Sequence, residues 1–132
     1  MAHPIQIILT RQLSSYLSVP VFLVDPNGDL LFYNEPAEII LGRRFEETGK
    51  MSAVEWSSVF TPLDDDRQPL LPENVPLRIT LTTKRPAYRR FFISGLDGTL
   101  RHIEVTSIPI SGLEGEFLGA AALFWEIPEQ CV

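Results

Sequence analysis

The chain has 132 residues, of which 45% are hydrophobic and 21% charged, and its formal net charge is −6. This length and balance predict one globular domain, and the acidity argues against a phosphate-binding surface, so we expect no nucleic-acid partner. The single cysteine, Cys131, excludes an intrachain disulfide and a cysteine-based zinc site, and without a signal-like N-terminus or a membrane-length apolar run we expect a soluble, cytoplasmic protein with no membrane partner.

Residues 1–18 are expected to form a separate N-terminal element. Apolar residues within 4–17 recur at steps of three and four, which predicts an amphipathic helix with Pro4 in its first turn. The apolar stripe fits two interpretations, packing on the helix's own domain or pairing with a second subunit. The candidate dimerisation residues are Ile5, Ile8, Leu9, Leu13 and Tyr16.

Residues 21–34 predict a β-hairpin that leads into a capped helix. Two apolar runs flank the turn-forming residues 25–28, in which Gly28 can adopt a positive φ without steric cost. Asn34 is suited to cap the following helix, with Pro36 in its first turn. Gly42 is suited to end that helix.

The middle of the chain carries less regular patterns. Residues 45–60 have apolar side chains at irregular spacing, which we interpret as one or two short helical turns separated by Gly49. Prolines recur through residues 61–76 and predict a long surface loop without a regular helix or a central strand. The three aspartates at 64–66 are consecutive in this loop, so their oxygens are not expected to converge on a cation.

The second half of the chain predicts one helix and three strands. Pro76 can start a short helix that continues over 77–83. Residues 88–94, 100–110 and 117–127 then predict strands joined by glycine-containing turns. Residues 118–125 are apolar on both faces of the last strand, so both faces should be covered. The order of elements predicts an α+β fold with an antiparallel sheet.

With these elements in order, the chain resembles a PAS domain. The matching features are the Val24-Asp25-Pro26-Asn27-Gly28 hairpin, the helix start at Asn34, Pro76-Leu77, Asp97-Gly98 ahead of Arg101, Pro109-Ile110, Gly115 and Gly119. The resemblance covers residues 15–127 and implies a PAS domain over 19–127, with a five-stranded antiparallel sheet, short helices on one face and a tail at 128–132. It also implies a sensory or dimerisation module, expected here as a homodimer, that signals to an output domain or a regulatory partner protein.

The resemblance further implies a ligand pocket between the sheet and the short helices. The apolar side chains expected to point into it are Phe22, Val24, Phe32, Trp56, Phe60, Leu77, Leu81 and Phe92. Each also fits a plain hydrophobic core, in which one such side chain contributes about 1.5–3 kcal/mol without any ligand.

The cofactor classes of PAS domains can be compared with the residues present. The covalent flavin and thioester classes need an internal cysteine, whereas Cys131 follows the last predicted strand. Haem-binding members typically use a histidine on the helix that here spans 77–83, which has none. His102 shares a strand face with Glu104 and Thr106, so we interpret it as an exposed or satisfied side chain and predict no metal site. A small organic ligand, or flavin or haem held in another way, stays open.

Three functions therefore compete: a ligand-binding sensor, a ligand-free interaction module and a small α+β enzyme. We expect no enzyme, because the sequence shows no Ser-His-Asp set, glycine-rich phosphate loop or paired carboxylates. Residues 126–128 stand where multi-domain PAS proteins often continue toward a coiled coil, and Pro128 discourages one. The chain is therefore expected either to signal by association or to lack an output domain that was removed.

Overall fold

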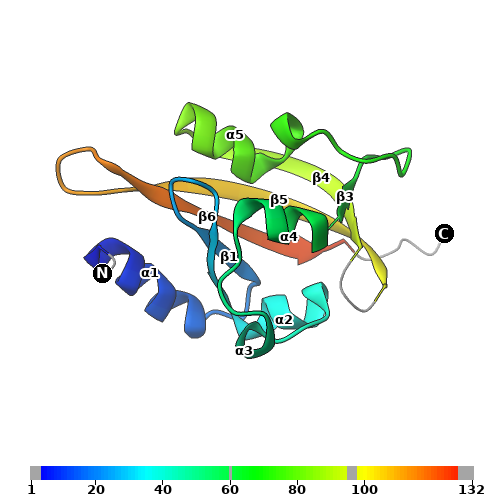
Figure 1. Ribbon diagram of the computed structural model, residues 1–132, viewed down its shortest axis with the longest axis horizontal. Helices are drawn as coiled ribbons and strands as arrows, with labels where there is room; N and C mark the ends of the chain where they lie inside the picture. The colour runs from blue at the N-terminus through cyan, green and yellow to red at the C-terminus, as the bar shows by residue number, and fades with distance from the viewer. Residues whose placement is uncertain (1–3, 60, 95–97, 128–132) are drawn as a thin grey trace.

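The computed structural model, described for residues 4–59, 61–94 and 98–127, forms a curled antiparallel sheet with strand order β2-β1-β6-β5-β4-β3 (Figure 1). The first half of the chain contains α1 (Ile5–Ser15), β1 (Val21–Val24), β2 (Leu30–Tyr33), α2 (Glu35–Leu41), α3 (Phe45–Thr48), α4 (Ala53–Val59) and β3 (Thr61–Leu63). The second half contains η1 (Pro72–Asn74), α5 (Pro76–Thr83), β4 (Ala87–Ser94), β5 (Leu100–Ser111) and β6 (Phe117–Glu126). The predicted α+β fold class with an antiparallel sheet is confirmed.

The predicted hairpin of β1 and β2 is held by its turn. The Asp25 carboxylate accepts hydrogen bonds from the backbone N–H groups of Asn27 and Asp29, at 2.9 and 3.0 Å. Gly28 has φ of +88°, the left-handed conformation that a glycine adopts without penalty. The turn residues therefore fix the tip of the hairpin through their own local hydrogen bonds.

Asn34 joins three elements at the end of β2. Its side-chain oxygen caps α2 by accepting from Ala37 N–H at 3.2 Å, and it also accepts from Val21 N–H at 2.9 Å. Its amide nitrogen donates to the carbonyls of Ser14 and Val19, both at 2.9 Å. The side chain is 1% exposed, so these bonds satisfy a fully buried amide. The predicted helix cap is thus also the link between α1, β1 and α2.

The sheet contains six strands, one more than predicted. The additional strand, β3, lies in the proline-rich stretch expected to be a loop, and Pro62 pairs there with Ile93 of β4. Proline removes a ladder donor, but an edge strand needs donors on only one side. Because β3 is the last strand of the sheet, the proline is accommodated.

The two faces of the sheet carry different layers. We call the inner face the one from which Phe22, Phe91 and Phe124 pack with residues of α2, α4 and α5. The opposite, outer face is partly covered by α1, whose Ile7 packs with Leu23 of β1. Ala120 and Ala122 belong to the inner cluster and Ala121 to the outer one, and all three are at most 2% exposed. The predicted covering of both faces of β6 is therefore confirmed at its centre, whereas Trp125 near its end is 40% exposed.

Helix α1 packs on its own domain through a different face from the predicted stripe. Its buried residues are Ile7 and Ser14. The five stripe residues are exposed: Ile5 by 64%, Ile8 by 45%, Leu9 by 55%, Leu13 by 61% and Tyr16 by 88%. The helix therefore has one face against the sheet and an apolar face directed away from it.

Candidate ligand pocket

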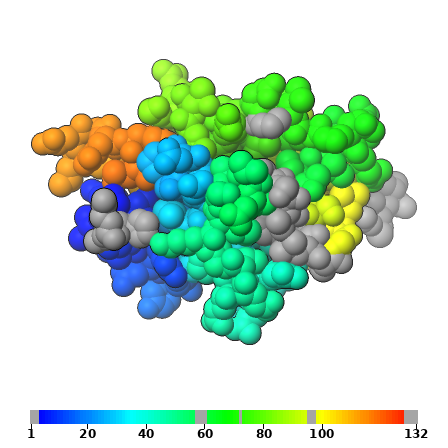
Figure 2. Space-filling model, viewed as in Figure 1, coloured from blue at the N-terminus to red at the C-terminus, as the bar shows by residue number. Residues whose placement is uncertain are grey.

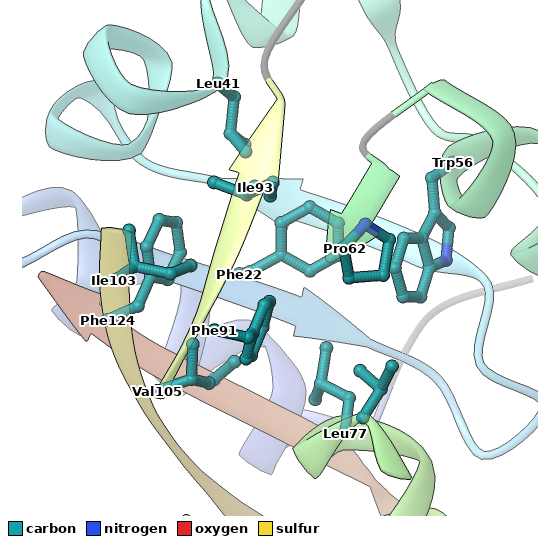
Figure 3. A pocket seen from close by; sticks show the side chains of 12 residues that line it. Phe22, Leu41, Trp56, Pro62, Leu77, Phe91, Ile93, Ile103, Val105 and Phe124 are labelled. Atoms are coloured by element: carbon teal, nitrogen blue, oxygen red, sulfur yellow. The ribbon is translucent and has the colours of Figure 1, made fainter. Parts of the chain in front are cut away.

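A cavity of about 60 Å³ lies between the inner face of the sheet and helices α2, α4 and α5. Its walls are Phe22, Leu41, Trp56, Pro62, Val75, Leu77, Phe91, Ile93, Ile103, Val105, Ala122 and Phe124. Figure 3 shows these side chains converging from the strands and from the helices that cover them. Every wall residue is apolar, so the cavity can accept apolar groups and presents no acid or base from the described residues.

A groove of about 320 Å³ lies beside the cavity, lined by residues of the β1–β2 hairpin tip, α4 and α5. Figure 2 shows the face of the molecule on which these three elements meet. Trp56, Pro62, Val75 and Leu77 line both the cavity and the groove. These four side chains therefore lie at the boundary between a small apolar space and a larger one whose volume lies within the usual range of ligand sites, about 300–1,000 Å³.

The hairpin tip fixes Trp56 in this wall. The indole Nε1 donates to the Gly28 carbonyl at 2.7 Å, and Ala53 N–H donates to the Asp29 carboxylate at 2.8 Å, which ties the start of α4 to the same turn. The indole packs edge-on against Phe22 at 5.1 Å between ring centroids. A Cβ on Gly28 would lie 3.3 Å from Leu81 of α5, so the tip also packs closely against the other wall.

Tyr33 places a polar group next to the cavity but directs it elsewhere. Its ring stacks on Phe22, with 6.0 Å between centroids. Its hydroxyl donates to the Arg43 carbonyl at 2.8 Å and lies 3.0 Å from the Thr48 hydroxyl. Burial raises the pKa of the Tyr33 phenol above its ordinary value, so this hydroxyl is a neutral donor at neutral pH.

Thr80 and Ser107 form the polar contact between α5 and the sheet. Both side chains are fully buried, and their hydroxyl oxygens are 2.5 Å apart. The Ser107 hydroxyl donates to the Pro76 carbonyl at 2.9 Å. These bonds position the first turns of α5, and thereby Leu77, over β5.

A protein-family model described as the PAS fold matches residues 15–130. The chain belongs to the PAS family. PAS domains are generally sensory, non-catalytic signalling modules, and they often dimerise or occur in signalling proteins with output domains. The extra edge strand β3 does not change this assignment, because the curled antiparallel sheet and its short helices match the family.

Solved structures of PAS and LOV proteins share this fold. The PAS domain of BvgS from Bordetella pertussis is 19% identical, with a TM-score of 0.63 over 95% of this chain and 88% of that one. The PAS domain of nitrogen regulation protein NR(II) from Vibrio parahaemolyticus is 14% identical, with a TM-score of 0.62 over 90% and 98%. The LOV protein of Rhodobacter sphaeroides is 14% identical, with a TM-score of 0.71 over 95% and 69%. No curated protein matches the sequence. These identities establish the fold alone.

The PAS fold brings half of the predicted pocket residues to the cavity or groove. Phe22, Trp56 and Leu77 line the cavity, and Leu81 lines the groove. Val24 is fully buried in the inner core without lining either space. Phe60 lies outside the described residues.

The placement of Phe32 and Phe92 in the pocket is corrected by the structure, because both lie on the outer face. Phe32 pairs with Leu23 in the sheet and lies under the Arg11 guanidinium, 4.7 Å from the ring centroid. Phe92 stacks on His102 with 4.4 Å between ring centroids, while its neighbour Phe91 points into the cavity. Adjacent residues of a strand point to opposite faces, so a shift of one position reverses the assignment.

The missed cavity residues include several from β4 and β5. A signal for them was available in β5, where apolar Ile103 and Val105 alternate with polar neighbours. Phe91 pairs with Ile103 across the β4–β5 ladder and therefore shares its face. Aligning the two strands by this alternation would have selected Phe91 over Phe92.

Among the described residues, no group of three His, Cys, Asp or Glu side chains is arranged to hold a metal ion. Within the same ranges, none of the helices has the length and apolar character needed to cross a membrane.

Proposed function

We propose that this PAS domain is a sensory or regulatory module that binds a small organic ligand in the cavity and groove of the inner face. The observation that carries the proposal is the apolar cavity, separated from the larger groove by four shared side chains. A ligand that displaced these side chains would join the two spaces and press on α4 and α5. Binding would thereby change the helices that cover the sheet.

The proposed role is regulatory and not catalytic. General acid–base catalysis needs a titratable group beside the reacting atoms. The described walls of the cavity are apolar, and Arg78 is the charged residue of the groove lining. Such a lining suits recognition of a ligand better than its chemical conversion.

The ligand proposal is tested on freshly purified protein by its visible absorption spectrum and by mass spectrometry of what a denaturing solvent releases. A coloured band or a stoichiometric small molecule is the expected result. A colourless protein that releases nothing, and whose melting temperature no compound of a metabolite collection raises, would argue against a ligand site.

We further propose that the module acts as a homodimer through α1. Its exposed apolar stripe, formed by Ile5, Ile8, Leu9, Leu13 and Tyr16, supports this. Contiguous exposed apolar side chains of this kind mark interaction surfaces. A second copy is the proposed occupant because two such helices offer each other the same apolar stripe, as an isologous interface requires. An output domain or regulatory protein would then respond to the dimer.

The dimer proposal is tested with the double substitution Leu9→Gln, Leu13→Gln. Both side chains are exposed, so the fold should be retained while the stripe loses its apolar centre. Light scattering during gel filtration should report a dimer for the native chain and a monomer for the double variant. The matched control is Gln12→Ala on the same helix, which should stay dimeric. A native monomer, or a dimer unaffected by the double substitution, contradicts the proposal.

A ligand-free interaction module is the second candidate function. It is favoured by the size of the cavity, about 60 Å³, and by the hydrogen bond that holds Trp56 to Gly28. In this alternative, the inner-face residues are only core, and all signalling passes through α1 and the outer face. The ligand experiment separates the two functions, because a ligand-binding sensor requires a bound small molecule and a ligand-free interaction module does not. The dimer experiment is expected to succeed for both.

A further inference from the structure

The described groove lining contains few polar groups and one charged side chain. Its lining is apolar except for Asn27 and Gly28 of the hairpin tip and Arg78 of α5. Among the described residues that line the groove, Arg78 carries the charge, and it is exposed. Within the described parts of the chain, no hydrogen bond or ion pair engages its guanidinium. The groove therefore combines apolar walls with one available cation.

This cation is unexpected from the overall charge. The chain carries a formal net charge of −6, and two acidic residues lie close in the sequence to groove-lining residues: Glu55 precedes Trp56, and Glu73 is two positions before Val75. Neither acid belongs to the groove lining. An arginine that is not paired with these acids can pair with an anion from solution, and its planar fork fits a carboxylate through two parallel hydrogen bonds.

The position of Arg78 relates the charge to the cavity. Arg78 follows Leu77 in the first turn of α5, and Leu77 lines both the groove and the cavity. The hydroxyl contacts of Thr80 and Ser107 hold this turn against β5. A ligand with its anionic end at Arg78 therefore has its remaining atoms beside Trp56 and Leu77, which separate the groove from the cavity.

We propose that the groove binds a small monocarboxylate with an apolar chain or ring, with its carboxylate on Arg78 and its apolar part directed past Trp56 and Leu77 toward the cavity. The inference rests on the proposed ligand-binding function and names the class of ligand. A second charge on the ligand would face apolar walls and would be costly to bury. Dicarboxylates are therefore expected to be rejected.

The test uses the full chain with octanoate as the probe, and with 1-octanol and succinate for comparison. Trp125→Phe leaves Trp56 as the remaining tryptophan, so its emission reports on the wall between the two spaces. Octanoate should change the Trp56 emission saturably, with calorimetry giving the affinity, whereas succinate should produce no change. 1-Octanol should bind through the same apolar walls but without the carboxylate contribution.

The decisive variant is Arg78→Gln, which should weaken octanoate binding by about tenfold or more, the order expected for a charge-assisted pair, and leave 1-octanol unchanged. The matched control is Arg85→Gln, an exposed arginine outside the groove lining with the same change of charge. It should bind octanoate as the native chain does. Arg78→Lys should recover part of the affinity, since it restores the charge but not the fork. Circular dichroism and urea unfolding confirm that each variant is folded.

Three results would overturn the inference. If the native chain and Arg78→Gln bind octanoate equally, the apolar binding site is retained, but the pairing of the carboxylate with Arg78 is rejected. Equal weakening by Arg85→Gln would show a general charge effect. If neither octanoate nor 1-octanol binds, apolar ligands of this kind do not occupy the groove, and the proposed function loses its support here as well.

Discussion

The inner and outer faces of the sheet are built from the same strands but differ in chemistry. The inner face of β4, β5 and β6 carries Phe91, Val105 and Phe124, all at most 5% exposed. On the outer face of the same strands, Tyr88 and Trp125 donate hydrogen bonds to Glu104, and Arg90 forms an ion pair with it at 3.6 Å. One face buries apolar surface, and the other offers hydrogen bonds next to the solvent.

This difference indicates which face of the sheet contributes more to the stability of the fold and which face can change its contacts more easily. Burial of apolar side chains is the larger energetic term, whereas exposed ion pairs contribute little. The inner face therefore maintains the fold and encloses the proposed ligand site. The outer face is partly covered by α1 and carries exposed polar contacts such as those around Glu104, which can change at a small cost, as suits a surface for partners.

The sharpest test of this comparison uses two neighbouring phenylalanines of β4. Phe91→Ala should lower the free energy of unfolding by about 3–5 kcal/mol, because it removes a buried ring of the inner core. Phe92→Ala should cost about 1 kcal/mol, because it loses only the stacking on His102 and the contact with Arg67. Urea unfolding measures both values, and similar losses would contradict the distinction between the faces.

A smaller effect is expected from the buried hydroxyl pair of the inner face. Ser107→Ala should cost about 2 kcal/mol, since it removes a bond to Pro76 and leaves the Thr80 hydroxyl buried without its partner. Ser111→Ala, at the exposed end of the same strand, is the control and should be nearly neutral.

Adding Thr80→Val to Ser107→Ala tests whether the two hydroxyls act as a pair. The double variant should lose less stability than the sum of the two single variants, because residues in contact are not additive. Additive losses in urea unfolding would show that the two hydroxyls act independently.

The smallest expected effect is the pH dependence of stability that Glu104 contributes on the outer face. The hydrogen bond from Tyr88 is the main cause that lowers the pKa of Glu104, so ionised Glu104 favours the folded state. This contribution is complete above the unfolded pKa of about 4.3 and is lost as the pH falls through the lower folded pKa. Glu104→Gln should slightly lower the urea midpoint at neutral pH, and the difference should vanish at the acidic end. A difference that is independent of pH would assign the effect to packing.

The sequence predicted the elements better than it predicted which face each residue occupies. The hairpin, the Asn34 cap and the three later strands follow from turn residues and capping chemistry, which act over a few positions. In Phe91-Phe92 and in the apolar run of β2, neighbouring residues are all apolar, so the pattern contains no alternation from which to read the face. The assignment then depends on the partner strand. The alternation in β5 indicates the face of Phe91, whereas β1, the partner of β2, is itself apolar throughout.

Neither the groove nor strand β3 could be predicted from the sequence, and the reasons are related. Arg78 lies in the helix that was predicted to start at Pro76, and nothing in the local sequence indicates that a hairpin tip will lie opposite it. The prolines of 61–76 argue correctly against a central strand, but they do not exclude an edge strand. Both features are set by contacts between distant segments.

Pro62 also bears on the solubility of the protein. An open strand edge offers N–H and C=O groups with which another molecule can pair, and this is a route to aggregation. At the β3 edge, Pro62 has no N–H to offer, and its carbonyl accepts from Leu70 N–H at 3.0 Å. Pro62, which made the sequence pattern favour a loop over a strand, therefore also opposes pairing of this sheet edge with a strand of a neighbouring molecule.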